Sequence, residues 1–273
     1  MAWLKLTNKS LYLMEKDRYR KKIDLREHNG TPALDIPLEW FKEDVSLPRV
    51  VSISNDGEPL PMPQPKFSGN DLASRILRYM QEKNYKIFEG AREYNIVYVE
   101  GMNTNGTLNN DEFNQFNDIR LVIEIADGRP KIVGGPWEAT TEPGDYYTDN
   151  PFIPEKGAAR IEFGQYTAWQ IDIHNSDHKA LVQSKGEISV CRDLNKDGAR
   201  TNDIVDTGNF WINQHHGYNN PKNNVGRASA GCLVGRTVSE HEAFMRLIEQ
   251  DRRYQESRDF VFTTTVIPGN ALS

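Results

Sequence analysis

Hydrophobic and polar residues alternate through most of the chain, and this two-residue period is typical of β-strands with one buried face. The pattern predicts strands at residues 2–7, 11–14, 22–25, 95–99, 119–125, 131–133, 160–163, 168–173, 187–191, 209–213 and 259–266. Turn sequences at residues 8–10, 28–30 and 127–130 separate several of them. The chain is therefore expected to be mainly β, of the β-rich α+β class.

Two segments instead carry the spacing of an amphipathic helix. The first covers residues 71–83, with Asn70 as the expected N-cap. The second begins near Ser239, which forms a capping-box pattern with Glu242 ahead of an apolar stripe. Both helices are expected to pack on the main domain.

A proline-rich segment divides the sequence. Residues 57–69, GEPLPMPQPKFSG, contain four prolines and are the expected linker. Residues 1–65 are then a small β-rich module of unknown role, for which a small barrel is plausible. Residues 66–273 form the main domain, whose core covers about residues 118–267.

Composition narrows the class of protein. The chain has 273 residues, of which 37% are hydrophobic and 26% charged, as in a soluble globular protein with a sizeable core. The formal net charge of −6 argues against nucleic acid as a partner, because a phosphate backbone is bound by a basic face. No apolar run reaches membrane-spanning length, so no transmembrane helix is expected.

The N-terminus and the cysteines bear on location. The first twenty residues, MAWLKLTNKSLYLMEKDRYR, lack a continuous apolar segment, so no signal peptide is expected. The two cysteines, Cys191 and Cys232, give no disulfide framework. Cys191 lies in an expected strand and is interpreted as a small buried residue.

Residues 212–236, INQHHGYNNPKNNVGRASAGCLVGR, carry the most specific chemistry. A His216-Gly217 pair precedes Ser-Ala-Gly-Cys232. A thiol and an imidazole are the minimum set for cysteine nucleophilic catalysis, in which the imidazole takes the thiol proton and the sulfur attacks a carbonyl. The small residues before Cys232 allow the sulfur to be exposed and backbone N–H groups to approach a substrate oxygen.

This arrangement resembles the active-site signature of the L,D-transpeptidase (YkuD-like) family, which has a His-Gly pair, a loop, and then Ser/Thr-x-Gly-Cys. Residues 137–144 are similar to the Thr-x-x-Gly turn that those domains carry upstream. The resemblance covers roughly residues 118–267 and implies a β-sandwich with a C-terminal helix. The chain differs from the family at Ala230, usually His or Arg, and at Val234, often Arg or Asn, and both differences bear on substrate recognition.

The resemblance also implies roles for the catalytic residues. Cys232 would be the nucleophile and His216 the general base that later protonates the leaving amine. Adjacent side chains on a strand face opposite ways, so only one of His215 and His216 can meet the thiol. We choose His216 because it precedes Gly217, whose backbone carbonyl would orient the imidazole. The N–H groups of Gly231 and Cys232 would form the oxyanion hole.

The residues proposed to contact substrate are Ser229, Arg236, Arg227, His215 and Tyr218. An arginine suits a substrate carboxylate because its guanidinium binds two oxygens at once. Each arginine is equally well interpreted as a surface residue. The Ser229 hydroxyl is also interpreted as a support for the turn, and His215 as a packed residue.

The expected activity is cysteine-dependent acyl transfer on peptides through a Cys232 thioester, and the resemblance implies peptidoglycan stem peptides of a bacterial cell wall. With water as acceptor the same site would be a carboxypeptidase or endopeptidase. The alternatives are a non-catalytic wall-binding module and a metal-dependent hydrolase using histidines such as His174 and His178, for which no third ligand is evident. No cofactor is expected. Action at the cell envelope or outside the cell would require non-classical delivery; otherwise the protein is cytoplasmic.

A weaker pattern concerns calcium. Asp193, Asn195 and Asp197 alternate ahead of Gly198, like the start of a calcium-binding loop. The twelfth position is Ile204, where an EF-hand requires a bidentate Glu. A tight polar turn explains the stretch equally well.

Overall fold

The computed structural model describes the backbone of residues 2–6, 10–15, 18–24, 26–28, 31–33, 50–51, 67–200 and 202–272, with side chains from Phe67 onward. The chain forms two compact units, Met1–Lys66 and Phe67–Ser273. In the first unit, the described strands form a sheet in the order β3-β2-β1-β6 and a hairpin, β4-β5. Their bounds are β1 (Ala2–Leu6), β2 (Ser10–Glu15), β3 (Arg18–Asp24), β4 (Arg26–His28), β5 (Thr31–Ala33) and β6 (Val50–Val51). Most of the expected linker lies outside the described residues.

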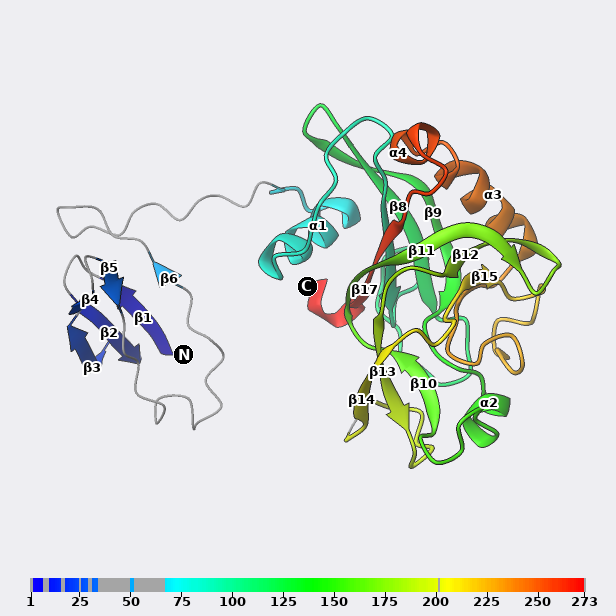
Figure 1. Ribbon diagram of the computed structural model, residues 1–273, viewed down its shortest axis with the longest axis horizontal. Helices are drawn as coiled ribbons and strands as arrows, with labels where there is room; N and C mark the ends of the chain where they lie inside the picture. The colour runs from blue at the N-terminus through cyan, green and yellow to red at the C-terminus, as the bar shows by residue number, and fades with distance from the viewer. Residues whose placement is uncertain are drawn as a thin grey trace. The chain divides into compact units, whose positions relative to one another are not determined.

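Eight strands of the second unit close into a barrel in the order β11-β12-β15-β16-β9-β8-β7-β17 (Figure 1). Neighbouring strands are antiparallel except for the parallel pairs β15–β16 and β17–β7. The bounds are β7 (Asn95–Glu100), β8 (Asp118–Ala126), β9 (Arg129–Thr140), β11 (Gly164–His174), β12 (His178–Gln183), β15 (Gln214–His216), β16 (Leu233–Gly235) and β17 (Phe262–Pro268).

The mainly β class predicted from the sequence is confirmed. The sandwich that the resemblance implies is not confirmed, because the short β15–β16 pair joins β12 to β9 and the sheet closes on itself. A second sheet has the order β10-β13-β14 and lies beside α2 in Figure 1. Its strands are β10 (Ala158–Ile161), β13 (Ile188–Asp193) and β14 (Ile204–Gly208).

The described helices are α1 (Leu72–Glu82), α2 (Asp145–Asp149), α3 (Val238–Ile248), α4 (Arg252–Glu256) and the 3₁₀ turn η2 (Gly269–Leu272). The α1 helix is capped by Asp71, whose carboxylate accepts from the Ser74 N–H at 3.0 Å, and not by Asn70. The α3 helix is capped by Thr237 with Glu240, two residues before the expected pair. In the described residues, no helix is long and apolar enough to cross a membrane.

Two apolar cores explain why β7 is buried along its whole length. Ile96 and Tyr98 pack with Trp169 in one core, which α3 completes. Val97 and Val99, on the opposite face of the strand, pack in a second core beneath α1. The successive side chains of β7 therefore stabilise two layers, as expected for a strand covered on both faces.

The segment before β15 differs from the prediction of a strand at residues 209–213. Trp211 has a left-handed backbone with φ of +55°, and its N–H donates to the Asn209 side-chain oxygen at 3.1 Å. A β-strand requires negative φ throughout, so this conformation prevents pairing here. The strand begins only at Gln214 and delivers His215 and His216 at its end.

Candidate active site

Cys232 directly precedes β16 and is partly exposed at the end of a tight turn. The buried Ser229 hydroxyl accepts from the Gly231 N–H at 3.1 Å and donates to the Cys232 carbonyl at 2.9 Å. Gly231 has φ of +119°, and a Cβ there would lie 2.3 Å from the Ala159 carbonyl oxygen. Gly231 therefore has no room for a side chain, and Ser229 shapes the turn instead of facing substrate.

The Cys232 sulfur contacts main-chain groups of the irregular segment. It accepts from the Asn213 N–H at 3.4 Å and donates to the Trp211 carbonyl at 3.8 Å. Burial raises the pKa of the Cys232 thiol to about 11, although the Asn213 N–H favours the thiolate. Burial and a hydrogen bond to Glu162 raise the pKa of Cys191 to about 12, so Cys191 is an inert thiol. Cys232 needs a base to react at neutral pH.

The register of β15 with β16 decides which histidine faces this thiol. His215 pairs with Val234, and His216 pairs with Gly235. Val234 belongs to a small apolar cluster against which Cys232 packs, whereas His216 lines a separate pocket beside α3. Paired residues in parallel strands point to the same face. This register favours His215 on the side of the thiol, where the sequence had favoured His216.

Hydrogen bonds assign different tautomers to the two rings. His215 Nδ1 lies 2.8 Å from the His216 carbonyl oxygen, which can only accept, so Nδ1 carries the proton. Its Nε2 has no hydrogen-bond partner among the described residues. His216 Nδ1 instead accepts from the Tyr218 N–H at 3.3 Å, so its proton is on Nε2. The orienting carbonyl therefore belongs to His216, whereas the N–H of Gly217 extends the strand pairing to Gly235.

Two residues that the sequence did not assign to the site hold the His215 ring. The His174 ring stacks on it, with centroids 4.2 Å apart and planes 10° from parallel. The Asn213 side-chain amide donates to His174 Nδ1 at 3.0 Å, and the side-chain oxygen of Asn213 accepts from the Gln183 N–H. Burial and neighbouring imidazoles lower the pKa of His215 to about 3 and that of His174 to about 4. Both rings are therefore neutral at physiological pH.

The other proposed substrate contacts are two arginines and Tyr218. Arg236 donates to Glu138 at 2.5 Å, and Arg227 stacks on the Tyr146 ring at 3.7 Å. Tyr218 is exposed and lies edge-on to the His216 ring. Arg236 is therefore paired with Glu138, and neither arginine is shown to contact the Cys232 sulfur.

One histidine cluster brings metal-ligating atoms together beside α3. Ligand atoms of Asp177, His178 and His216 lie within 4.8 Å of one another. The two imidazoles stack at 3.7 Å and 23°, so their lone pairs run side by side and do not converge. The Asp177 carboxylate is hydrogen-bonded to His178 Nδ1 at 3.0 Å. The rings would have to turn before they could share a metal ion.

A buried carboxylate cluster offers the second group of ligand atoms, from Glu100, Asp111 and Glu142. The Arg160 guanidinium already binds it, at 3.0 Å from Glu100 and 3.4 Å from Asp111, and it also donates to Glu142. Arg200 adds a second cation on Glu100. Positive side chains therefore occupy the position that a metal would take.

In the expected calcium loop, side-chain oxygens that would bind calcium already accept hydrogen bonds from within the loop. The buried Asp193 carboxylate accepts from the N–H groups of Asp197 and Gly198, both at 3.0 Å. Asn195 donates to Asp197 at 2.7 Å. These bonds favour the interpretation as a tight polar turn, because Asp193 already satisfies backbone donors.

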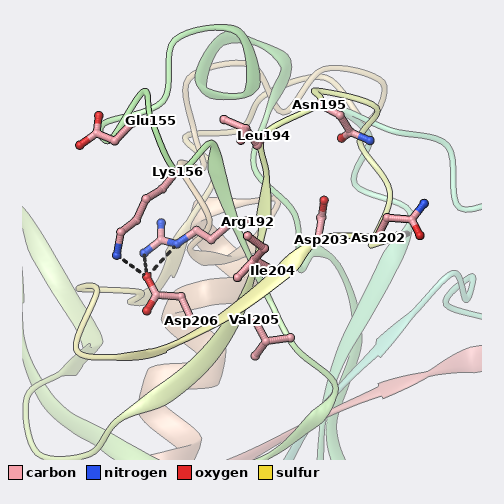
Figure 2. A pocket seen from close by; sticks show the side chains of 10 residues that line it. All are labelled: Glu155, Lys156, Arg192, Leu194, Asn195, Asn202, Asp203, Ile204, Val205 and Asp206. Carbon is pink, nitrogen blue, oxygen red and sulfur yellow. Dashed lines mark hydrogen bonds and ion pairs between the residues drawn. The ribbon is translucent and has the colours of Figure 1, made fainter.

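Two pockets share Arg192 as part of their walls. The larger, about 560 Å³, is lined by β13, β14 and the turn before β10, and Figure 2 shows Asp206 between Lys156 and Arg192. Asp206 lies 2.8 and 3.1 Å from these cations. The smaller, about 420 Å³, is lined by Ala230 and by Trp211, whose carbonyl accepts from the Cys232 sulfur, although Cys232 itself does not line it.

Comparison with known proteins assigns no family: no protein-family model matches the chain, and no curated protein sequence matches it. The candidate site is therefore defined by its geometry. It consists of Cys232 on its glycine turn, His215 with Nε2 available, and the adjoining pocket.

Proposed function

We propose that the second unit, Phe67–Ser273, is an L,D-transpeptidase-like cysteine acyltransferase that forms a thioester between Cys232 and the acyl part of a peptide. The observation that carries this proposal is the His215 imidazole. Its pairing with Val234 favours the side of the thiol, its Nδ1 is held by a carbonyl, and its Nε2 is available as a base. The signature residues of the sequence support the same chemistry.

The directions of the two pKa shifts indicate how the proposed reaction begins. A thiol whose pKa is raised to about 11 and an imidazole whose pKa is lowered to about 3 do not form an ion pair in the free protein. Proton transfer from Cys232 to His215 Nε2 therefore accompanies attack on the substrate carbonyl. His215 then gives this proton to the departing amine, and an incoming amine or water resolves the thioester.

The oxyanion formed during attack requires main-chain donors. The Gly231 N–H already donates to Ser229, so we do not propose it as the main donor. The Cys232 N–H has no hydrogen-bond partner among the described residues. We propose this group as the main donor, since it belongs to the nucleophile itself.

Peptidoglycan stem peptides are the substrates that the resemblance suggests, with hydrolysis of wall peptides as the alternative outcome when water is the acceptor. A non-catalytic peptide-binding module is the second candidate. The raised pKa of Cys232 favours it, because a neutral thiol is unreactive without a working base.

Acylation by a small thioester separates these candidates. The protein is incubated at pH 7 with the ethyl thioester of N-acetylglycine, and intact mass and peptide mapping locate the acetylglycyl adduct. Labelling of Cys232 that His215→Ala abolishes and His216→Ala retains is the expected result. Cys191 is the internal control and stays unlabelled. Equal labelling in wild type and His215→Ala, or none in either, would contradict the proposal.

A further inference from the structure

The pocket beside Cys232 has apolar walls. Four aromatic residues line it together with small and aliphatic residues, and its volume is about 420 Å³. The aromatic residues are Tyr147, Phe152, Phe210 and Trp211. This volume lies within the range of small-molecule binding sites.

Two of these four aromatic side chains are exposed to solvent. Trp211 is 74% exposed and Phe152 is 79% exposed, and exposed apolar side chains that gather at one site are typical of binding surfaces. Trp211 also has a left-handed backbone, which is unfavourable for a bulky residue. The Trp211 carbonyl accepts from the Cys232 sulfur at 3.8 Å, so the strained residue joins the pocket to the nucleophile.

Charge is nearly absent from the same walls. Arg192 is the charged residue that lines the pocket, and its guanidinium is bonded to Asp206 at 3.1 and 3.3 Å. It also lies over the Phe210 ring at 4.6 Å. Ala230 adds only a methyl group beside the turn. A substrate carboxylate would lose water here without gaining an unpaired cation.

We infer that this pocket is the acyl-donor subsite, and that it takes an aromatic or branched apolar side chain on the residue whose carbonyl Cys232 attacks. The inference rests on the proposed acyl transfer and changes its substrate class, from the stem peptides that the resemblance suggests to peptides with an apolar side chain on the acyl residue. An apolar side chain in the pocket places the following carbonyl near the Cys232 sulfur, because the Trp211 main chain contacts both. Anionic side chains are disfavoured.

The test compares ethyl thioesters of N-acetylphenylalanine, N-acetylglycine and N-acetylaspartate. In each reaction the bond from Cys232 sulfur to the acyl carbon forms and the bond to ethanethiol breaks. The thiol proton passes through His215 to the departing ethanethiolate. The second-order rate constant of acylation, from intact mass, is expected to be at least about tenfold higher for phenylalanine than for glycine, and lowest for aspartate.

Two variants and a matched control show where this preference arises. Trp211→Asn, in which Asn tolerates the left-handed backbone, and Phe152→Ser are expected to lower the phenylalanine-to-glycine ratio several-fold. Ile204→Ser removes a similarly exposed apolar side chain that lines only the larger pocket, and the ratio stays at its wild-type value.

The outcomes separate the two proposals. If glycyl thioester labels Cys232 but the ratio is near one, or is unchanged in Trp211→Asn and Phe152→Ser, the subsite is wrong and the acyltransferase proposal stands. If no thioester labels Cys232, the proposed function is overturned and the subsite with it.

Discussion

The Nδ1 atom of His215 donates to the main-chain carbonyl oxygen of His216 at 2.8 Å. This bond fixes both the orientation of the ring and its tautomer, since a carbonyl oxygen has no proton to give. The neighbouring His216 uses its own Nδ1 as an acceptor. Two adjacent residues of the same type are therefore prepared for opposite roles, and only His215 has Nε2 available as a base.

The tautomers can be measured directly. We expect long-range ¹H–¹⁵N correlation spectra at pH 7 to show His215 protonated at Nδ1 and His216 at Nε2. Because burial lowers the pKa of His215 to about 3, its ring signals should not titrate between pH 8 and pH 5. A His215 titration near the ordinary pKa of about 6.5, or an Nε2-protonated His215, would contradict the assignment.

Gly231→Ala should be strongly destabilising. The new Cβ would lie 2.3 Å from the Ala159 carbonyl oxygen, on a residue with φ of +119°. We expect a loss of more than about 3 kcal/mol in the free energy of unfolding, measured with urea. The control is Gly106→Ala, which has φ of +82° but no atom within 4 Å of its Cβ, and should lose about 1 kcal/mol.

Ser229→Ala tests the turn that presents the thiol. The substitution leaves the Gly231 N–H and the Cys232 carbonyl without their shared partner. The expected loss is about 1–3 kcal/mol, because the groups are buried. The partly exposed Ser189, whose hydroxyl pairs with Thr207, is the matched control, and Ser189→Ala should change stability by less than about 0.5 kcal/mol. Equal effects at the two serines would show that the turn does not depend on Ser229.

Glu142→Gln should weaken the pH dependence of stability. Burial raises the pKa of Glu142 well above its ordinary value, against the lowering effect of Arg160. Above pH 4.5 the unfolded carboxyl loses its proton while the folded one keeps it, so stability falls as pH rises towards the folded pKa. Gln keeps the bond from Arg160 and places its NH₂ where Glu142 Oε2 has no partner. Urea unfolding at pH 5 and pH 8 should show a smaller difference in the variant.

Glu138→Gln is the control of opposite sign. Burial raises the pKa of Glu138, but Lys222 and Arg236 lower it more, so the net pKa is below its ordinary value. Its stabilising contribution is lost only as pH falls below about 4.5, outside the window measured. The slope between pH 5 and pH 8 should therefore match that of wild type. A Glu142→Gln protein with the wild-type slope would show that Glu142 is ionised in the folded state.

Local patterns in the sequence were sufficient for the strand-rich class, for both long helices and for the presence of a thiol on a small-residue turn. These features depend on residues close together in the chain. The β7 strand and the α1 helix are examples, since side-chain periodicity alone determines which faces are apolar. The cap of α3 was misplaced by two residues because Thr237–Glu240 and Ser239–Glu242 both fit the capping pattern.

The sequence by itself determined that Cys232 would follow a turn of small residues and that a histidine pair would precede it. Only the tertiary structure bears on which histidine faces the thiol. The register between β15 and β16 joins segments separated by a long loop, and a shift of one residue reverses every side chain. No local pattern encodes that register. The stacking of His174 and the pocket around Trp211 likewise arise only when β11, β15 and the β10–β13 region come together.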